Sequence, residues 1–196
     1  MRRIVSALVT LTLILSIQGC VNKEKAIDRK VKILEEEAAL AIKTKNYNLA
    51  EEKLEAALEF RPDSEYVTNN LAVICAQYSN KPEKAIKLWS QIIEKNPKNA
   101  AYFNNIAGLY WQKGEIEKAI DHYKKASELQ PEYHMPAFNL AQIYLDKGDL
   151  EKAEEYAQKS YNLTPQDSRV ALMLARTQLL NNKRTNAKQV LQKVYE

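Results

Sequence analysis

The chain has 196 residues, enough for one ordinary domain with a sizeable core, and it holds only four glycines and six prolines. Charged residues make up 28% of it and give a formal net charge of +4, but no lysine- or arginine-rich block stands out, which argues against nucleic acid as a partner. Alanine, leucine, lysine and glutamate dominate and alternating β-branched stretches are few, so the composition predicts an all-α fold.

The N-terminal segment has the pattern of a secretory signal. Arg2 and Arg3 form a short positive region, and the apolar run from Ile4 to Ile17 that follows has the length of a signal-peptide core. A helix needs about 20 apolar residues to span a bilayer, so this run is short for a membrane span. On this pattern alone, an ordinary cleaved signal peptide and an uncleaved N-terminal anchor both stay open.

The end of the apolar run resembles the lipobox of bacterial lipoproteins. Ile17, Gly19 and Cys20 match its aliphatic, small and cysteine positions, whereas Gln18 is larger than the residue usual at that place. The resemblance implies a signal peptide at residues 1–19, cleavage before Cys20, and acylation of Cys20 as the lipidation site. Several acyl chains together hold a protein firmly on a membrane, so a lipid anchor is expected.

The same resemblance implies a place in the cell. Residues 20–30 are expected to form the lipidated cysteine and a short tether, which keeps the remaining chain close to the membrane. In bacteria with two membranes, an aspartate after the cysteine commonly retains a lipoprotein at the inner membrane, and Val21 stands there instead. We therefore expect a membrane-anchored lipoprotein of the bacterial cell envelope, on the outer membrane and facing the periplasm if the source has two membranes.

A period of 34 residues runs through the rest of the chain. Proline recurs at intervals of 35, 34 and 34 residues, and alanine stands twelve residues before each proline and once more near the C-terminus. Landmarks in one phase over several copies indicate a repeated structural unit. They are Pro62, Pro97, Pro131 and Pro165, and Ala50, Ala85, Ala119, Ala153 and Ala187.

Each unit has the pattern of two amphipathic helices. In residues 100–133, apolar residues recur at helical spacing on both sides of residues 113–115. Gly114 suits the left-handed backbone conformation that ends a helix. Asparagine tolerates the same conformation, and the corresponding joints hold Gly148 in the fourth repeat, Asn80 within residues 79–81, and the pair Asn181 and Asn182.

This pattern resembles the tetratricopeptide repeat (TPR) family over about residues 31–196. The resemblance implies an all-α fold, a right-handed α–α superhelix (a TPR solenoid) of about five helix–turn–helix repeats. The repeats are expected at about 31–64, 65–99, 100–133, 134–167 and 168–196. The third repeat carries the resemblance on Phe103, Ile106, Ala107, Tyr110, Ala119, Tyr123, Ala126 and Pro131, and the fourth on Leu140, Ala141, Tyr144, Gly148, Ala153 and Pro165.

The small residues of the repeats have a mechanical reason. Ala107 and Ala141 are expected where the two helices of a unit cross, and Ala119 and Ala153 where neighbouring units meet. A larger side chain at these places separates the helices or strains them. The repeat tyrosines and tryptophans are interpreted as packing residues that fill the wider gaps.

The sequence shows no pattern that indicates catalysis. The only histidines, His122 and His134, have no metal-ligand partner at helical spacing and are interpreted as solvated or rim residues. Cys75 takes the place that Tyr110 and Tyr144 take in later repeats, which predicts a small buried core residue rather than a nucleophile. Four glycines leave little material for a phosphate-binding loop. We therefore expect no enzyme, no cofactor, no metal site and no small-molecule substrate.

In TPR proteins the first helix of each repeat lines a concave surface, which implies a partner-binding groove here. Asn70, Asn105 and Asn139 occupy the same inward position in three successive repeats. An amide both donates and accepts hydrogen bonds, so such a file can hold the backbone of an extended peptide; the alternative is that asparagine simply suits a wet surface. The expected partner-binding residues are Tyr66, Asn70, Asn105, Trp111, Phe138, Asn139 and Arg169.

The two resemblances together imply protein or peptide partners at a membrane. The leading hypothesis is a membrane-anchored scaffold that docks envelope proteins and helps to assemble a secretion, pilus or outer-membrane machine. The alternative is a regulatory adaptor that recruits or restrains an envelope enzyme, such as a protease or a cell-wall enzyme. Both rest on analogy with the families rather than on the residues themselves.

Overall fold

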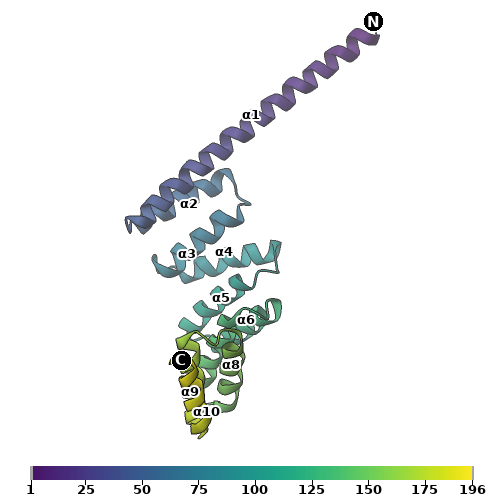
Figure 1. The fold of residues 1–196 in the computed structure, drawn as a ribbon. Helices are drawn as coiled ribbons and strands as arrows, with labels where there is room; N and C mark the ends of the chain where they lie inside the picture. Colours follow the sequence, from purple (N-terminus) through teal and green to yellow (C-terminus); the bar gives the residue numbers. More distant parts are fainter. Residues whose placement is uncertain (1, 196) are drawn as a thin grey trace. The chain divides into compact units, whose positions relative to one another are not determined.

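The computed structural model describes the backbone of residues 2–195 and the side chains of residues 21–193. Over this range it consists of ten α helices and contains no strand, which confirms the all-α prediction (Figure 1). The helices are α1 (Arg2–Lys43), α2 (Tyr47–Phe60), α3 (Glu65–Gln77), α4 (Pro82–Lys95), α5 (Ala100–Gln112), α6 (Ile116–Leu129), α7 (His134–Asp146), α8 (Leu150–Leu163), α9 (Ser168–Leu180) and α10 (Arg184–Tyr195).

The chain divides into two compact units, Met1–Leu88 and Trp89–Glu196, with the boundary inside α4. In the first unit α1 packs against α2 and α2 against α3. In the second unit each helix from α5 to α9 packs against the helix that follows it, and α7 also packs against α9. Contacts restricted to neighbours in the sequence are typical of repeat proteins, in which no repeat buries its apolar face alone.

The joints between the two helices of each pair contain one residue with a left-handed backbone. Gly114 has φ +77° and Gly148 has φ +75°, and the predicted asparagines do the same, with φ 51° at Asn80 and 60° at Asn182. The backbone N–H of Gly114 donates to Trp111 O over 2.9 Å and that of Glu115 donates to Tyr110 O over 2.9 Å, so these two carbonyl groups at the end of α5 are satisfied. The first joint uses Lys45 instead, with φ 59°.

The repeat alanines are buried in the core. Ala119 and Ala153 are 0% exposed, as predicted for residues between neighbouring repeats. Tyr123 belongs to the same hydrophobic cluster, and burial raises the pKa of its phenol well above the ordinary value. The core of the second unit also contains Ala107, Ile120, Leu140, Ala141, Ile143, Tyr144, Ala157, Val170, Leu174, Ala175 and Ala187.

A buried carboxylate joins the first two repeats. Glu51 on α2 is 5% exposed, and its carboxylate accepts hydrogen bonds from Lys81 Nζ (2.8 and 3.0 Å), Lys84 Nζ (2.7 Å) and Ser79 Oγ (2.9 Å). Burial alone raises the pKa of Glu51, but the hydrogen bonds from Lys81, Lys84 and Ser79 outweigh it and lower the pKa to about 2. The carboxylate therefore stays charged, and it fixes the joint that precedes α4.

The last two repeats contain a related contact. Glu154 on α8 accepts hydrogen bonds from Asn181 Nδ2 (2.6 Å) and from Lys183 Nζ (2.9 Å) in the joint between α9 and α10. Glu51 and Glu154 each follow a repeat alanine directly. Ile120 occupies the position equivalent to Glu51 two repeats later, and there an apolar side chain is buried in the core in place of the carboxylate.

The alanine contacts predict intolerance to bulk at neighbouring-repeat positions. Ala119→Leu and Ala153→Leu should each lower the free energy of unfolding by about 1–3 kcal/mol, because the added atoms have no space. Denaturant melts of the purified protein measure the change. Ala39→Leu, at an exposed place on α1, is the matched control and should change stability by less than about 0.5 kcal/mol. Unchanged melts for both buried variants would contradict the repeat phase.

The Glu51 contacts predict a loss of stability in acid. Because the folded pKa lies below the ordinary value of 4.5, the stabilisation is complete above about pH 4.5 and disappears as the pH falls towards 2. At pH 7, Glu51→Gln should cost about 1.5–3 kcal/mol, the range for hydrogen bonds to charged groups. The measurement is denaturant unfolding at pH 7 and at about pH 3, with the exposed Glu59→Gln as control. An equal acid effect in wild type and Glu51→Gln would show that Glu51 contributes nothing.

Candidate protein-binding surface

All seven predicted partner-binding residues lie on the first helices of the repeats. In the second unit they come from three helices, α5, α7 and α9, and in the first unit from α3. Asn105 and Trp111 lie on α5, Phe138 and Asn139 on α7, Arg169 on α9, and Tyr66 and Asn70 on α3.

The aromatic members of the second unit are half-buried. Trp111 and Phe138 both pack against the hydrophobic core of that unit and keep part of their rings at the surface. Their positions are therefore held by core packing, which orients a rigid apolar edge outward. Rigid aromatic side chains are common anchors at protein interfaces.

The asparagines differ in what they bind within the chain. Asn139 Nδ2 donates to Asn104 Oδ1 over 3.3 Å, so this amide links α7 to α5 and has one N–H and its oxygen left for a ligand. The side chain of Asn105 has no hydrogen-bond partner among the described residues and is half-buried. We call Asn105, Trp111, Phe138 and Asn139 the first-helix surface. It combines amide groups that have hydrogen-bonding capacity left with two half-buried aromatic side chains.

Arg169 has a partner of its own at the start of α9. Its guanidinium binds the carboxylate of Asp167 through Nε (3.2 Å) and Nη2 (2.8 Å), and the Asp167 carboxylate also accepts the Arg169 backbone N–H. The hydrogen bonds from Arg169 lower the pKa of Asp167 to about 2. The charge of Arg169 is thus balanced locally, although the side chain is exposed to solvent.

Tyr66 and Asn70 belong to the first unit. Tyr66 is largely exposed, and Asn70 is half-buried one turn further along α3. Neither side chain has a hydrogen-bond partner in the described part of the chain.

The residues considered for chemistry lie in packing environments. Cys75 is buried, which confirms it as a core residue, and burial together with the Glu51 charge raises the pKa of its thiol to about 11. His122 is half-buried beside the rings of Phe103 and Tyr110, and its Nδ1 lies 2.9 Å from Lys118 O. His134 is also half-buried. Among the described residues, no cluster of three potential metal ligands occurs.

The predicted membrane anchor lies outside the described side chains. This holds for Cys20, the predicted lipidation site, and for the predicted signal peptide at residues 1–19. Where side chains are described, we find no helical stretch with the length and hydrophobicity that a membrane span requires. Residues 21–30, predicted as a tether, are part of α1.

The paired helices agree with the repeat families that match the sequence. A family described as "TPR repeat" matches residues 109–148, and one described as "Tetratricopeptide repeat" matches residues 137–167. The chain is a tetratricopeptide repeat protein. A comparison with curated protein sequences gives no match.

Solved TPR structures share the fold of this TPR protein. A crystal structure of the MamA protein superposes with a TM-score of 0.71 at 17% identity and covers 85% of this chain and 91% of that one. MamA from Desulfovibrio magneticus RS-1 gives a TM-score of 0.71 at 14% identity over 85% and 93% of the two chains. The pilF protein of Pseudomonas aeruginosa gives 0.71 at 24% identity over 86% and 78%. At these identities the likeness concerns the fold.

The TPR repeats support protein–protein interaction as the role of this chain. Sequence reasoning placed the candidate residues on first helices, but it missed the hydrogen bond between Asn104 and Asn139. It also missed the buried Glu51 network. The sequence did contain a signal for the Glu51 network. Cys75 contacts the Glu51 carboxylate, and it stands at the position that Tyr110 and Tyr144 occupy in later repeats.

Proposed function

We propose that this TPR protein is a membrane-anchored scaffold that docks an extended peptide segment of an envelope protein on its first-helix surface. The observation that carries the proposal is the combination of half-buried Trp111 and Phe138 with the amides of Asn105 and Asn139 on adjacent first helices. The aromatic edges supply apolar contact, and the amides pair with the donors and acceptors of a peptide backbone.

The free amide of Asn105 supports this function over a purely structural one. Asparagine is unfavourable in the middle of a helix, and Asn105 lies near the middle of α5. Its side chain makes no hydrogen bond within the described chain that would offset this cost. A ligand that binds the amide supplies the missing partner. Asn139 is different, because its contact with Asn104 gives it a structural role as well.

The lipid anchor is the second half of the proposal. A signal peptide ending before Cys20 and acylation of Cys20 would fix the start of α1 at a membrane surface. Residues 21–30 are helical, so they rise about 1.5 Å each, or about 15 Å in total, rather than the about 30–35 Å of an extended tether. Arg61 Nη2 contacts Asp28 Oδ1 and Glu24 Oε1, each at 2.5 Å, and so ties this part of α1 to the end of α2.

The proposed setting is the cell envelope, on the outer membrane facing the periplasm where two membranes exist. There the scaffold helps to assemble a secretion, pilus or outer-membrane machine. Recruitment or restraint of an envelope protease or cell-wall enzyme is the alternative use of the same surface. The identity of the protein recovered on the first-helix surface separates the two.

The first-helix surface predicts a loss of partner binding without a loss of folding. In the Asn105→Ala/Asn139→Ala double variant, partner affinity should fall by about 1–3 kcal/mol, the sum of two hydrogen bonds of about 0.5–1.5 kcal/mol each. The measurements are co-purification of the partner from membranes after crosslinking, and a denaturant melt. Asn162→Ala, at an exposed place on α8, is the matched control. Full partner recovery by a normally stable double variant would rule out this surface.

The anchor predicts that membrane attachment depends on one sulfur atom. Cys20→Ser should abolish incorporation of labelled fatty acid and should leave the precursor uncleaved, because the acylated thiol is the substrate of that processing. Cys75→Ser is the control, since Cys75 is buried and should leave labelling unchanged. Equal labelling of wild type and Cys20→Ser would contradict the lipoprotein assignment.

A further inference from the structure

Three positions of the first helices α3, α7 and α9 are buried, and each of these helices packs against the helix that precedes it. They are the third, seventh and tenth residues counted from the start of the repeat. In α3, α7 and α9, which pack against α2, α6 and α8 respectively, all of these residues are buried. They are Val67, Leu71 and Ile74 in α3, Pro136, Leu140 and Ile143 in α7, and Val170, Leu174 and Thr177 in α9.

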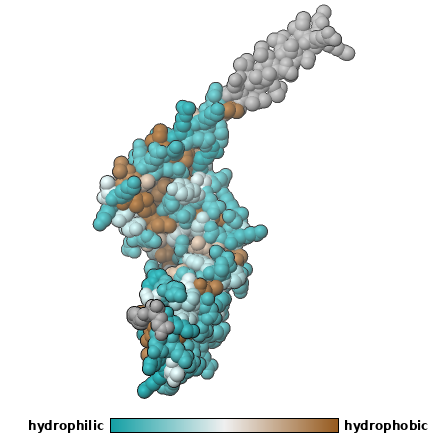
Figure 2. Space-filling model, in the orientation of Figure 1, coloured by the Kyte–Doolittle hydropathy of each residue, from teal (hydrophilic) through white to brown (hydrophobic). Residues whose placement is uncertain are grey.

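The equivalent positions of α1 are open. Ile33 is 50% exposed and Leu40 is 62% exposed, and between them Glu37 replaces the buried leucine of other repeats. The three residues are spaced i, i+4 and i+7, so they form one stripe along the helix. We call Ile33, Glu37 and Leu40 the head stripe. Figure 2 shows hydrophobic surface around α1 and α2 within a mostly hydrophilic face.

A second stripe is open on α9. The fifth residue of the third repeat, Asn104, binds Asn139 of the fourth, and Leu145 at the twelfth position of α7 is buried, whereas Phe138 and Trp111 at these two positions of other repeats are half-buried. On α9 these positions hold Leu172 and Leu179, which are 52% and 50% exposed. Arg176 lies between them at the same i, i+4, i+7 spacing, and Leu172, Arg176 and Leu179 form the tail stripe.

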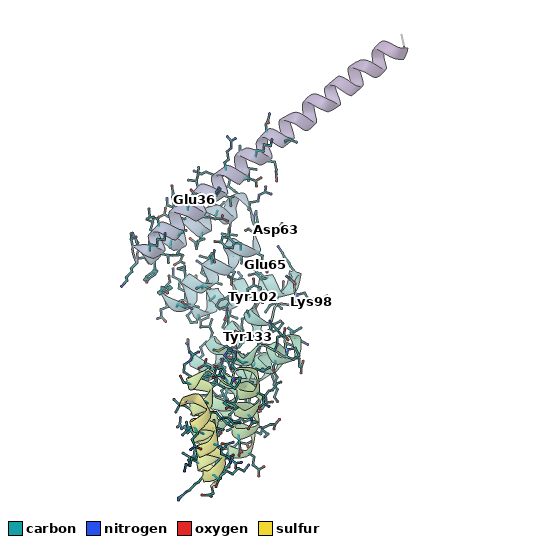
Figure 3. The ribbon with its side chains drawn as sticks, viewed as in Figure 1. Glu36, Asp63, Glu65, Lys98, Tyr102 and Tyr133 are labelled. Carbon is teal, nitrogen blue, oxygen red and sulfur yellow. The ribbon has the colours of Figure 1, made fainter. Side chains whose placement is uncertain are left out.

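The two stripes have complementary charges. The head stripe is apolar–acidic–apolar, and Glu35 and Glu36 precede Glu37 on α1, with Glu36 labelled in Figure 3. The tail stripe is apolar–basic–apolar, and Arg176 has no ion-pair partner among the described residues. Residues 168–193 contain six basic residues and no acidic residue, namely Arg169, Arg176, Lys183, Arg184, Lys188 and Lys193.

We propose that the protein associates with itself head to tail, with the tail stripe of one copy packed on the head stripe of a second copy. The contact extends the stack at the head stripe, because the equivalent positions of α3, α7 and α9 are buried, and it covers the exposed leucines of the tail stripe. Arg176 of one copy lies opposite Glu37 of the next, while the two apolar pairs leave water. Glu37 already binds Lys53 over 3.3 Å, and a carboxylate accepts a second cation readily.

The interface joins two different surfaces, so it is heterologous. After the first contact, one copy still has a free head stripe and the other a free tail stripe. Association therefore continues beyond a dimer unless the assembly closes on itself. A scaffold that forms such rows presents its first-helix surface repeatedly along a membrane. Binding of several weak ligands to a row then gains avidity from the linkage.

Disulfide crosslinking of the full-length protein in its native membrane tests the proposal. Two differently tagged copies are co-expressed, one carrying Leu40→Cys and the other Leu179→Cys. We expect an oxidant-dependent crosslink between the two tags, and none when either added cysteine is absent, because Cys75 is buried. Crosslinks only between identical positions, crosslinks only to another protein, or no crosslink would each overturn head-to-tail association.

Charge reversal gives a second, independent readout. Glu37→Arg or Arg176→Glu alone should lower the crosslink yield by about tenfold, because like charges then face each other across the interface. Combining Glu37→Arg in every copy with Arg176→Glu should restore the yield to within about twofold. Glu59→Arg, at an exposed place on α2, is the control. Unchanged yield in both single variants, or no recovery in the double variant with normal helix content by circular dichroism, would overturn the pairing.

Discussion

The burial of alanine between neighbouring helices is the constraint on which the rest of this structure depends. Ala119 and Ala153 are fully buried, and they belong to the same hydrophobic cluster as Tyr123 and Ile143. Each of these helix pairs packs internally and also against the pair beside it, as expected for a stack of repeats. Stability, surface properties and the open stripes at α1 and α9 all follow from this dependence on a neighbour.

Variation at one position changes what the first helix of a repeat contacts. Where the first helix carries Tyr144, the ring stacks on Tyr156 of the same repeat at 5.5 Å between centroids, and Lys152 lies over it. Where Cys75 replaces the tyrosine, the smaller side chain leaves room for the Glu51 carboxylate, which recruits Lys81 and Lys84. The same architecture therefore accepts an aromatic or an ionic contact, provided that the buried charge is fully hydrogen-bonded.

Much of the fold could be predicted from the sequence because it depends on local and periodic signals. The 34-residue period, the left-handed joints at Gly114 and Gly148, and the burial of Cys75 are each written in residue type and spacing. Lys45 in a left-handed joint gave no such signal. The Asn104–Asn139 bond was hidden because it depends on the rotation of two helices about their axes, which spacing within a single repeat does not determine.

The candidate surface also has features that the sequence could predict and features that only the structure reveals. Residue type and repeat phase placed Asn105 and Asn139 on first helices, whereas only the structure distinguishes an amide with a partner from one without. That distinction carries the functional account, because a half-buried amide without a partner on a rigid scaffold is suited to bind a peptide backbone. The exposure of Leu172 and Leu179 was equally hidden, since the sequence of α9 resembles that of a covered helix.

The most direct test of the account is site-specific photocrosslinking in living cells. A photoreactive amino acid replaces Asn105 on α5 in one strain and Asn162 on α8 in another, with membrane attachment and melting checked for both. The account predicts that illumination joins a distinct envelope protein to the chain from position 105 and not from position 162. Adducts from position 162 alone, or from neither position in a strain that assembles its envelope normally, would contradict it.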